Sequence, residues 1–159
     1  MRLFSFCLIV LSLLLTACGF RPLYGEAGPG AMAVKEALNT VMIGNIPDRE
    51  GQYLRNALID RFYTGGYPQR PAYLLDVSPV AESITDLDIT KSSDATRAQL
   101  RLSTSISLRD AKSGKVVLQR KLTAVTSYNI LNSQFTTRVS EENTRRNGLD
   151  QLAAQIENQ

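Results

Sequence analysis

Apolar and polar residues alternate most regularly between Gln99 and Arg109. Every second position is apolar or threonine, and the positions between them are glutamine, arginine or serine. A period of two residues is typical of an antiparallel β-strand with one buried and one solvated face. The positions expected to face the core are Leu100, Leu102, Thr104, Ile106 and Leu108.

A partner strand is predicted from Val116 to Tyr128, after the turn sequence Asp-Ala-Lys-Ser-Gly at 110–114. A short polar turn with glycine between two alternating segments indicates a β-hairpin. Arg120 interrupts the inward face of this strand, which otherwise holds Leu118, Leu122 and Ala124.

Earlier in the chain, the apolar run 41–46 predicts a short strand that Pro47 stops. Asp48 is then expected to cap a helix with apolar residues at three- and four-residue spacing up to Phe62, which Gly65 and Gly66 end. Alternation resumes in a strand at 73–78, where Pro79 predicts a bulge or a break.

A helix is predicted at the C-terminal end, with a polar middle from Ser140 to Gly148. Its apolar positions are Val139, Leu149, Leu152, Ala153 and Ile156. The element order is strand, helix, three strands, helix, and the first two strands are expected to be parallel because a helix connects them. The expected fold is therefore α+β, a two-layer, four-stranded and mostly antiparallel mixed sheet with two helices on one face.

The first residues predict an export signal. Arg2 precedes an apolar run from Leu3 to Leu15, which is too short for a membrane-spanning helix of about twenty residues. The next residues complete the sequence Leu15-Thr16-Ala17-Cys18, which resembles the bacterial lipobox at all four positions. The resemblance implies cleavage before Cys18, an S-diacylglyceryl group on its sulfur and an N-acyl chain. An ordinary secretory signal with a chance cysteine is the alternative.

The expected organisation is a cleaved signal peptide at 1–17, a lipidated N-terminus and tether at 18–40, and a single domain at 41–159. Two or more acyl chains hold a protein stably on a membrane, whereas one does not. Residue Gly19 is not the aspartate that retains lipoproteins at the inner membrane of enteric bacteria. We therefore expect the outer membrane as the location.

Composition argues against an enzyme. The chain has no histidine and only two cysteines, of which Cys7 leaves with the signal and Cys18 is committed to lipid. The usual Ser/His/Asp arrangement and most zinc chemistry are thus absent, and we expect neither catalytic residues nor a metal or cofactor.

Two acidic pairs remain as candidates for acid/base chemistry. Asp86 and Asp88 are expected to share one face of a strand as solvated edge charges. Glu141 and Glu142 lie four residues before Arg145 and Arg146, the favourable order for ion pairs along a helix. Both pairs are interpreted as surface residues.

Charge divides unevenly along the chain. Residues 26–90 carry five basic and nine acidic side chains, whereas residues 91–146 carry eleven basic and four acidic ones. Thirteen of the eighteen basic residues are arginine, which suits bidentate contacts with phosphate or carboxylate. Anionic headgroups of the membrane, lipopolysaccharide and a merely solvated basic face all remain open, while nucleic acid is excluded by the export signal and the lack of any recognised motif.

The octet Cys-Gly-Phe-Arg-Pro-Leu-Tyr-Gly at 18–25, together with the element order, resembles the lipopolysaccharide-assembly lipoprotein family LptE in its alphaproteobacterial form. The resemblance implies a non-enzymatic lipoprotein, anchored on the periplasmic side of the outer membrane, that sits in the lumen of the LptD barrel and contacts lipopolysaccharide. A barrel lumen is polar, which suits the serine- and arginine-rich face at 99–109. The alternative is an envelope lipoprotein that binds another anionic ligand, peptidoglycan or a lipid, without a barrel.

The family places lipopolysaccharide contacts on basic residues near a strand turn and near the start of the last helix. By this resemblance the candidates are Lys91 in the turn 90–96 and Arg138. Arg97 takes the place of Lys91 if the register differs. Asp94 dilutes the positive charge of the turn.

Overall fold

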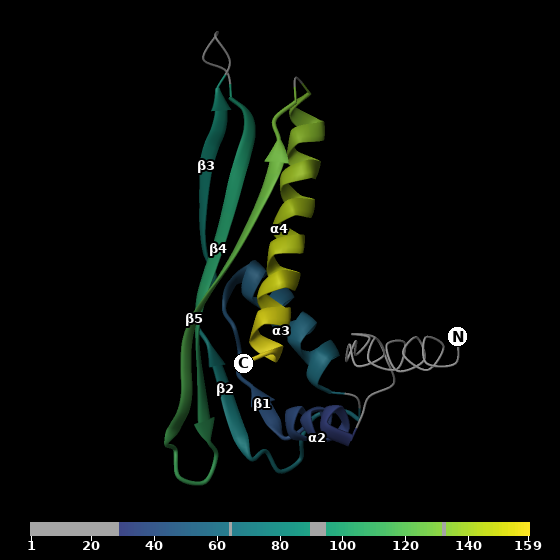
Figure 1. The fold of residues 1–159 in the computed structure, drawn as a ribbon, viewed down its shortest axis with the longest axis vertical. Helices are drawn as coiled ribbons and strands as arrows, with labels where there is room; N and C mark the ends of the chain where they lie inside the picture. The colour runs from purple at the N-terminus through teal and green to yellow at the C-terminus, as the bar shows by residue number, and fades with distance from the viewer. Residues whose placement is uncertain (1–28, 64, 90–94, 132) are drawn as a thin grey trace, which may run out of the picture. The chain divides into compact units, whose positions relative to one another are not determined.

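The longest strand, β4 (Ala95–Asp110), organises the sheet in the computed structural model, which describes residues 29–63, 65–89, 95–131 and 133–159. One edge of β4 pairs antiparallel with β5 (Val116–Asn129). Its other edge pairs antiparallel first with β3 (Ala81–Ile89) and then with β2 (Tyr73–Val77). The short strand β1 (Val41–Ile43) lies parallel to β2 (Figure 1).

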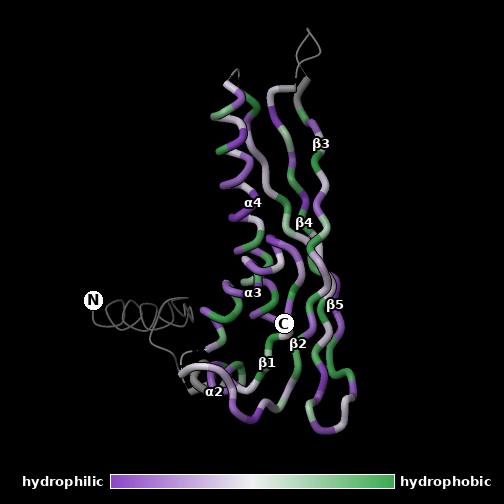
Figure 2. Tube along the Cα trace, turned by 180° about the vertical axis from the view of Figure 1, so that it is seen from behind, coloured by the Kyte–Doolittle hydropathy of each residue, from purple (hydrophilic) through white to green (hydrophobic). Residues whose placement is uncertain are grey.

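The sheet has one apolar and one polar face because its strands alternate. Leu100, Leu102, Thr104 and Ile106 of β4 are buried, and the serines and arginines between them are partly or fully exposed. Green and purple segments alternate along the strands accordingly (Figure 2). The buried Thr104 hydroxyl donates a hydrogen bond of 2.7 Å to the Ser78 carbonyl oxygen, which satisfies both groups.

Two helices, α3 (Asp48–Phe62) and α4 (Gln134–Glu157), pack on the apolar face. Their apolar residues form one core with the sheet, and the largest fully buried side chains are Ile46, Leu54, Leu58, Leu100, Leu102, Ile106 and Leu152. Helix α4 approaches β4 closely at Gly148, where an added Cβ would lie 2.8 Å from Leu102 Cδ1. Glycine at this position lets the helix and the sheet share one tight layer of side chains.

The predicted two-layer α+β fold with a mixed sheet is confirmed, with one more strand than expected. Pro79 does break the chain: β2 ends at Val77 and β3 begins at Ala81, and both pair with the same edge of β4. The Ser78 N–H still donates to the Ser105 carbonyl oxygen of β4 at 2.9 Å. Proline cannot donate to a strand ladder, so the ladder stops at Pro79 and the chain resumes it as a separate strand.

The expected cap of α3 is wrong. Asp48 is the first helical residue, with a left-handed φ of 66°, and no side chain caps the helix. Helix α4 does have a side-chain cap, since the Ser133 hydroxyl accepts a hydrogen bond from the Thr136 N–H.

The chain divides into two compact units, residues 1–33 and 34–159, and the fold above is that of the second. A further helix, α2 (Pro29–Leu38), lies in the range expected to be a tether, and its last residue, Leu38, packs against the core. Among the described residues, no helix has both the length and the apolar composition to cross a membrane.

Candidate functional site

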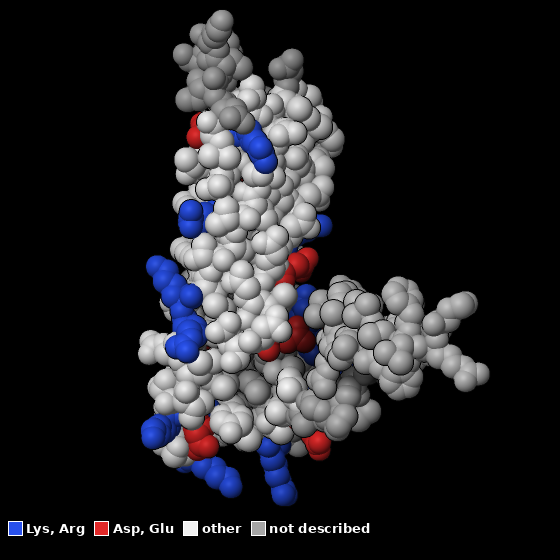
Figure 3. Space-filling view, in the orientation of Figure 1, with Lys and Arg blue, Asp and Glu red and all other residues white. Residues whose placement is uncertain are grey.

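The polar face of the sheet gathers basic side chains from neighbouring strands. Arg101 and Arg109 of β4 and Lys121 of β5 lie on it among the serines at 103, 105 and 107. Arg109 forms an ion pair with Asp76, whereas Arg101 and Lys121 form none within the described part of the chain. In Figure 3 most of the Lys and Arg side chains in view (blue) lie along the left side and the lower end.

Two of the three predicted contact residues lie at one end of the sheet, where β4 and α4 both begin. Arg97 is exposed near the start of β4, and one of its guanidinium nitrogens donates a hydrogen bond of 3.0 Å to the Ser127 hydroxyl. Arg138 is exposed in the second turn of α4. Lys91 and Cys18 lie outside the described residues.

The structure does not join Arg97 and Arg138 into one cluster. Arg97 lies on the polar face, because it follows the alternation of Arg101 along β4. Arg138 precedes Glu142 by four residues and Arg145 by seven, so it shares their flank of α4, and α4 packs on the apolar face. The two arginines therefore offer positive charge on two sides of the same end.

A charged network around Arg145 joins α4 to β3. The Arg145 guanidinium donates two hydrogen bonds of 2.8 Å to Glu82, which lies on β3. It also pairs with Glu141 at 2.7 Å and with Glu142 at 3.1 Å. Its side chain is 17% exposed, and the carboxylates, Glu82 foremost, raise the pKa of Arg145 further above its ordinary value.

The helical part of this network confirms the predicted ion pairs between Glu141–Glu142 and Arg145–Arg146. Glu82 is the member that sequence reasoning missed, because it is 63 residues from Arg145 and meets it only through sheet pairing. Its one local signal was its position in an alternating segment, which says nothing about a partner on a distant helix.

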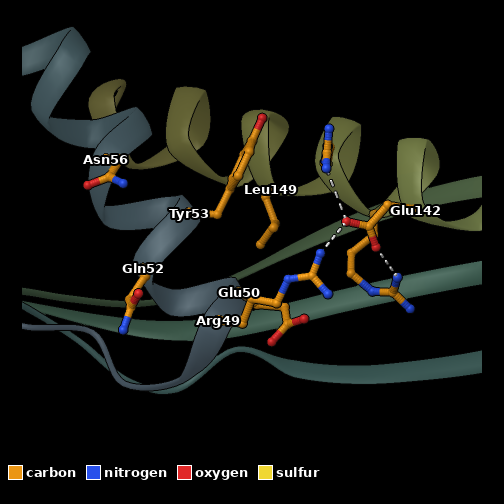
Figure 4. Close-up of a pocket in the computed structure, with 9 residues that line it drawn as sticks. Arg49, Glu50, Gln52, Tyr53, Asn56, Glu142 and Leu149 are labelled. Atoms are coloured by element: carbon orange, nitrogen blue, oxygen red, sulfur yellow. Dashed lines mark hydrogen bonds and ion pairs between the residues drawn. The ribbon is translucent and has the colours of Figure 1, made fainter.

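An open cavity of about 450 Å³ lies between α3 and α4 beside this network. It is lined by Arg49, Glu50, Gln52, Tyr53, Asn56, Glu142, Arg145, Arg146 and Leu149. Figure 4 shows Arg49 of α3 reaching toward Glu142 of α4, and the two pair at 2.9 Å. Arg146 also pairs with Glu142, at 3.4 Å.

The cavity lies where paired charged side chains join α3 to α4. This geometry favours a structural contact between the helices over acid/base chemistry. Glu142 forms ion pairs with three guanidinium groups, those of Arg49, Arg145 and Arg146, so its carboxylate is already engaged by cations. The Tyr53 hydroxyl lies 3.3 Å from an Asp150 carboxylate oxygen, and burial together with that carboxylate raises the pKa of Tyr53. Within the described residues no group of three or more acidic side chains could hold a metal ion.

The remaining acidic pair, Asp86 and Asp88, lies on β3. Asp86 pairs with Ala98 and Asp88 with Arg97, with a register shift between them. Asp86 is exposed, as expected for a charge on an edge strand.

The family model for LptE, described as lipopolysaccharide-assembly, matches residues 38–159. No curated protein sequence matches the chain significantly. Solved structures with the same fold include a Caulobacter crescentus protein described as a lipoprotein, at 21% identity and a TM-score of 0.58, covering 79% of this chain and 91% of that one.

Two further structures show the same fold. The minor lipoprotein from Acinetobacter baumannii is 22% identical, with a TM-score of 0.56 and coverage of 76% of this chain and 90% of that one. The rare lipoprotein B from Shewanella oneidensis is 12% identical, with a TM-score of 0.56 and coverage of 74% and 88%.

Proposed function

Because the chain belongs to the LptE family of lipopolysaccharide-assembly proteins, we propose that it is a lipoprotein of the outer membrane that binds the LptD barrel. In this role it assists the passage of lipopolysaccharide to the cell surface and catalyses no reaction. The family match over residues 38–159 carries the proposal. The lipobox at 15–18 supports a signal peptide at 1–17 and lipid on Cys18.

The two faces of the sheet support a position inside a barrel. A barrel lumen is polar and wet, so a protein within it needs a solvated exterior around its own core. The polar face of β4 and β5 meets this need with serine, threonine and free cationic side chains. The apolar face is already covered by α3 and α4.

The proposed lipopolysaccharide contacts are Lys91, Arg97 and Arg138. Phosphate groups of the glycolipid are suitable partners for guanidinium groups. Arg97 and Arg138 are both exposed at the end of the sheet where β4 begins. Arg138 forms no ion pair within the described part of the chain, so its charge is available to a ligand.

Co-purification tests the partnership. A tagged copy of the full chain, extracted from membranes in mild detergent, is expected to bring the barrel with it at a fixed ratio. Recovery of the folded protein without the barrel would contradict the proposal. A Cys18→Ser copy in the same experiment separates the contribution of the anchor from that of the domain.

Charge reversal tests the contact residues. Arg97→Glu combined with Arg138→Glu is expected to weaken binding of purified lipopolysaccharide at least several-fold without changing the circular dichroism spectrum. Arg120→Glu combined with Lys121→Glu is the matched control, because it changes the net charge by the same amount at two exposed positions of β5, opposite Ile106 and Ser105. Equal binding by the variant at Arg97 and Arg138 and by the control would remove both residues from the site.

A further inference from the structure

The end of the sheet opposite Arg97 and Arg138 has no role in the function proposed above. Three segments meet there: residues 34–38 at the end of α2, the loop 65–72 before β2, and the β4–β5 turn with its flanks, 110–117. We name them together the basal surface. Figure 1 shows α2, the start of β2 and the β4–β5 turn at the lower end of the drawing.

Hydrogen bonds hold these segments together. Val41 of β1 lies opposite Tyr73 of β2, and Tyr73 lies opposite Asp110 of β4. The Ala111 N–H donates to the Ala72 carbonyl oxygen at 2.9 Å, which ties the turn to the loop. The Ala72 N–H in turn donates to the Thr40 carbonyl oxygen at 2.9 Å. The basal surface is therefore one connected part of the fold.

Its exposed charge is mostly positive. The three segments carry four basic residues, Lys35, Arg70, Lys112 and Lys115, and two acidic ones, Glu36 and Asp110. None of the four basic side chains forms an ion pair with another described residue. Blue side chains project from the lower end of the molecule in Figure 3, with red ones among them.

Asp110, the acidic residue of the turn, has a structural role. One Asp110 carboxylate oxygen accepts hydrogen bonds from the Ser113 N–H at 2.7 Å, the Ser113 hydroxyl at 2.8 Å and the Lys112 N–H at 3.1 Å. These bonds lower the pKa of Asp110. They also order the turn, with Gly114 at a φ of 69°, so Lys112 and Lys115 are presented on a defined loop.

Large apolar side chains are exposed beside these cations. Val34 is 58% exposed, Tyr67 55%, Val116 47% and Val117 51%. Val116 and Val117 follow Lys115 directly at the start of β5, where a register shift opposite Arg109 interrupts the regular alternation of the strand. Lysine and arginine next to exposed aliphatic and aromatic residues are the combination found on proteins that lie in the headgroup layer of an anionic membrane.

We propose that the basal surface rests on the bilayer that carries the lipid anchor, with anionic phospholipid headgroups as its ligand. The inference rests on the lipidation of Cys18 proposed above. The chain that follows Cys18 enters the folded unit at Val34, within the basal surface. The opposite end is the length of β4 away, roughly 50 Å for a strand of 16 residues. The segment that carries the anchor is therefore joined to the folded unit at its cationic end.

Contact with lipid orients the domain as well as adding affinity. Two acyl chains alone hold the protein at the membrane but do not fix the orientation of the folded unit. Electrostatic attraction at the basal surface holds this end at the headgroups of the periplasmic leaflet. The end with Arg97 and Arg138 is then the one that enters the barrel, where these proposed contact residues meet the lipid substrate.

The chain has no tryptophan, which allows a single-reporter test. Val117→Trp places one indole on the basal surface, and Phe135→Trp places one at the opposite end, where Phe135 is 78% exposed. Each lipidated full-length variant is purified from membranes and reconstituted in bilayers of phosphatidylcholine with about one third phosphatidylglycerol and brominated acyl chains.

We expect bromine to quench Val117→Trp fluorescence at least twofold and to leave Phe135→Trp nearly unchanged. Adding Lys112→Gln and Lys115→Gln to Val117→Trp should reduce that quenching, and so should bilayers of phosphatidylcholine alone. Equal quenching at both ends would overturn the proposal. If the quenching is unchanged by the two lysine substitutions and by the lipid charge, anionic lipid is not the ligand.

Two other outcomes identify different causes. A mass spectrum that shows no lipid on Cys18 would remove the premise of the inference, while the co-purification of the barrel would remain a separate result. Shielding of Val117→Trp only in samples that contain the barrel would assign the basal surface to a protein contact, and would overturn the proposal while supporting the proposed function. Circular dichroism of each variant confirms that the fold is intact.

Discussion

The two parts of the sheet are held by different means. Where β1, β2, β4 and β5 lie side by side, α3 and the C-terminal half of α4 cover them, and bulky residues such as Ile46, Leu58 and Leu152 are fully buried. Where only β3, β4 and β5 continue, the N-terminal half of α4 covers them. Leu100 and Leu102 are fully buried there beside the small residues Ala98, Thr144 and Gly148, and Ile84 on β3 remains 45% exposed.

The difference shows how a sheet can extend beyond its main core. In the four-strand part, apolar area removed from water supplies the stability. In the three-strand part, small residues bring α4 close to the sheet and the Arg145–Glu82 pair ties β3 to the helix. The second part is therefore expected to open more easily and to depend more on ionic conditions.

The largest effect is expected from a cavity in the four-strand part. Leu58→Ala removes a fully buried side chain of α3 and should lower the free energy of unfolding by about 2–5 kcal/mol. Urea denaturation measures this change. Asn56→Ala, an exposed position in the same helix, should change stability by less than about 0.5 kcal/mol. Similar losses for the two variants would contradict the assignment of the core.

A smaller effect on stability is expected from removing the Arg145 ion-pair network in the three-strand part. Arg145→Met leaves Glu82 and Glu141 unpaired but within reach of water, so it should cost about 1–2 kcal/mol. Relative to the wild type, the variant should show a larger acceleration of hydrogen exchange at the β3 amides than at those of β1 and β2. The control is Arg146→Met, because Arg146 makes one pair at 3.4 Å and is 54% exposed. Uniform acceleration across both parts would show that the network serves the whole domain.

The smallest effect concerns Tyr128, which is 8% exposed in the three-strand part. Burial first, and then the carboxylates of Glu141 and Asp86, raise the pKa of Tyr128 above 10.0. A raised folded-state pKa means that the neutral phenol is favoured in the fold. The contribution of Tyr128 to the free energy of unfolding is present below pH 10 and is lost as the pH rises through the pKa of Tyr128 in the folded state.

Tyr128→Phe should therefore match the wild type at pH 7 and lose less stability than the wild type above pH 10. Thermal unfolding at a series of alkaline pH values measures the difference. Tyr53, whose pKa is also raised, remains in both proteins, so part of the alkaline loss should persist. Identical alkaline profiles would show that Tyr128 does not contribute.

Most of the fold could be predicted because its signals are local. The alternation at 99–109 and the three- and four-residue spacing in α3 report which face of each element is buried, whatever lies against it. The same locality predicted the pairs between Glu141–Glu142 and Arg145–Arg146, which lie one helical turn apart. Pro79 marked the interruption of the sheet, since a missing N–H has the same effect in any context.

The rest depended on contacts between distant residues. The bulge that separates Asp86 from Asp88 arises from pairing with β4, and pairing register is not visible in β3 alone. Glu82 reaches Arg145 only because β3 and α4 flank the same strands. The sequence thus specifies the elements and their buried faces through short-range periodicity, whereas the partners of each charged side chain were decided when packing brought the sheet and the helices together.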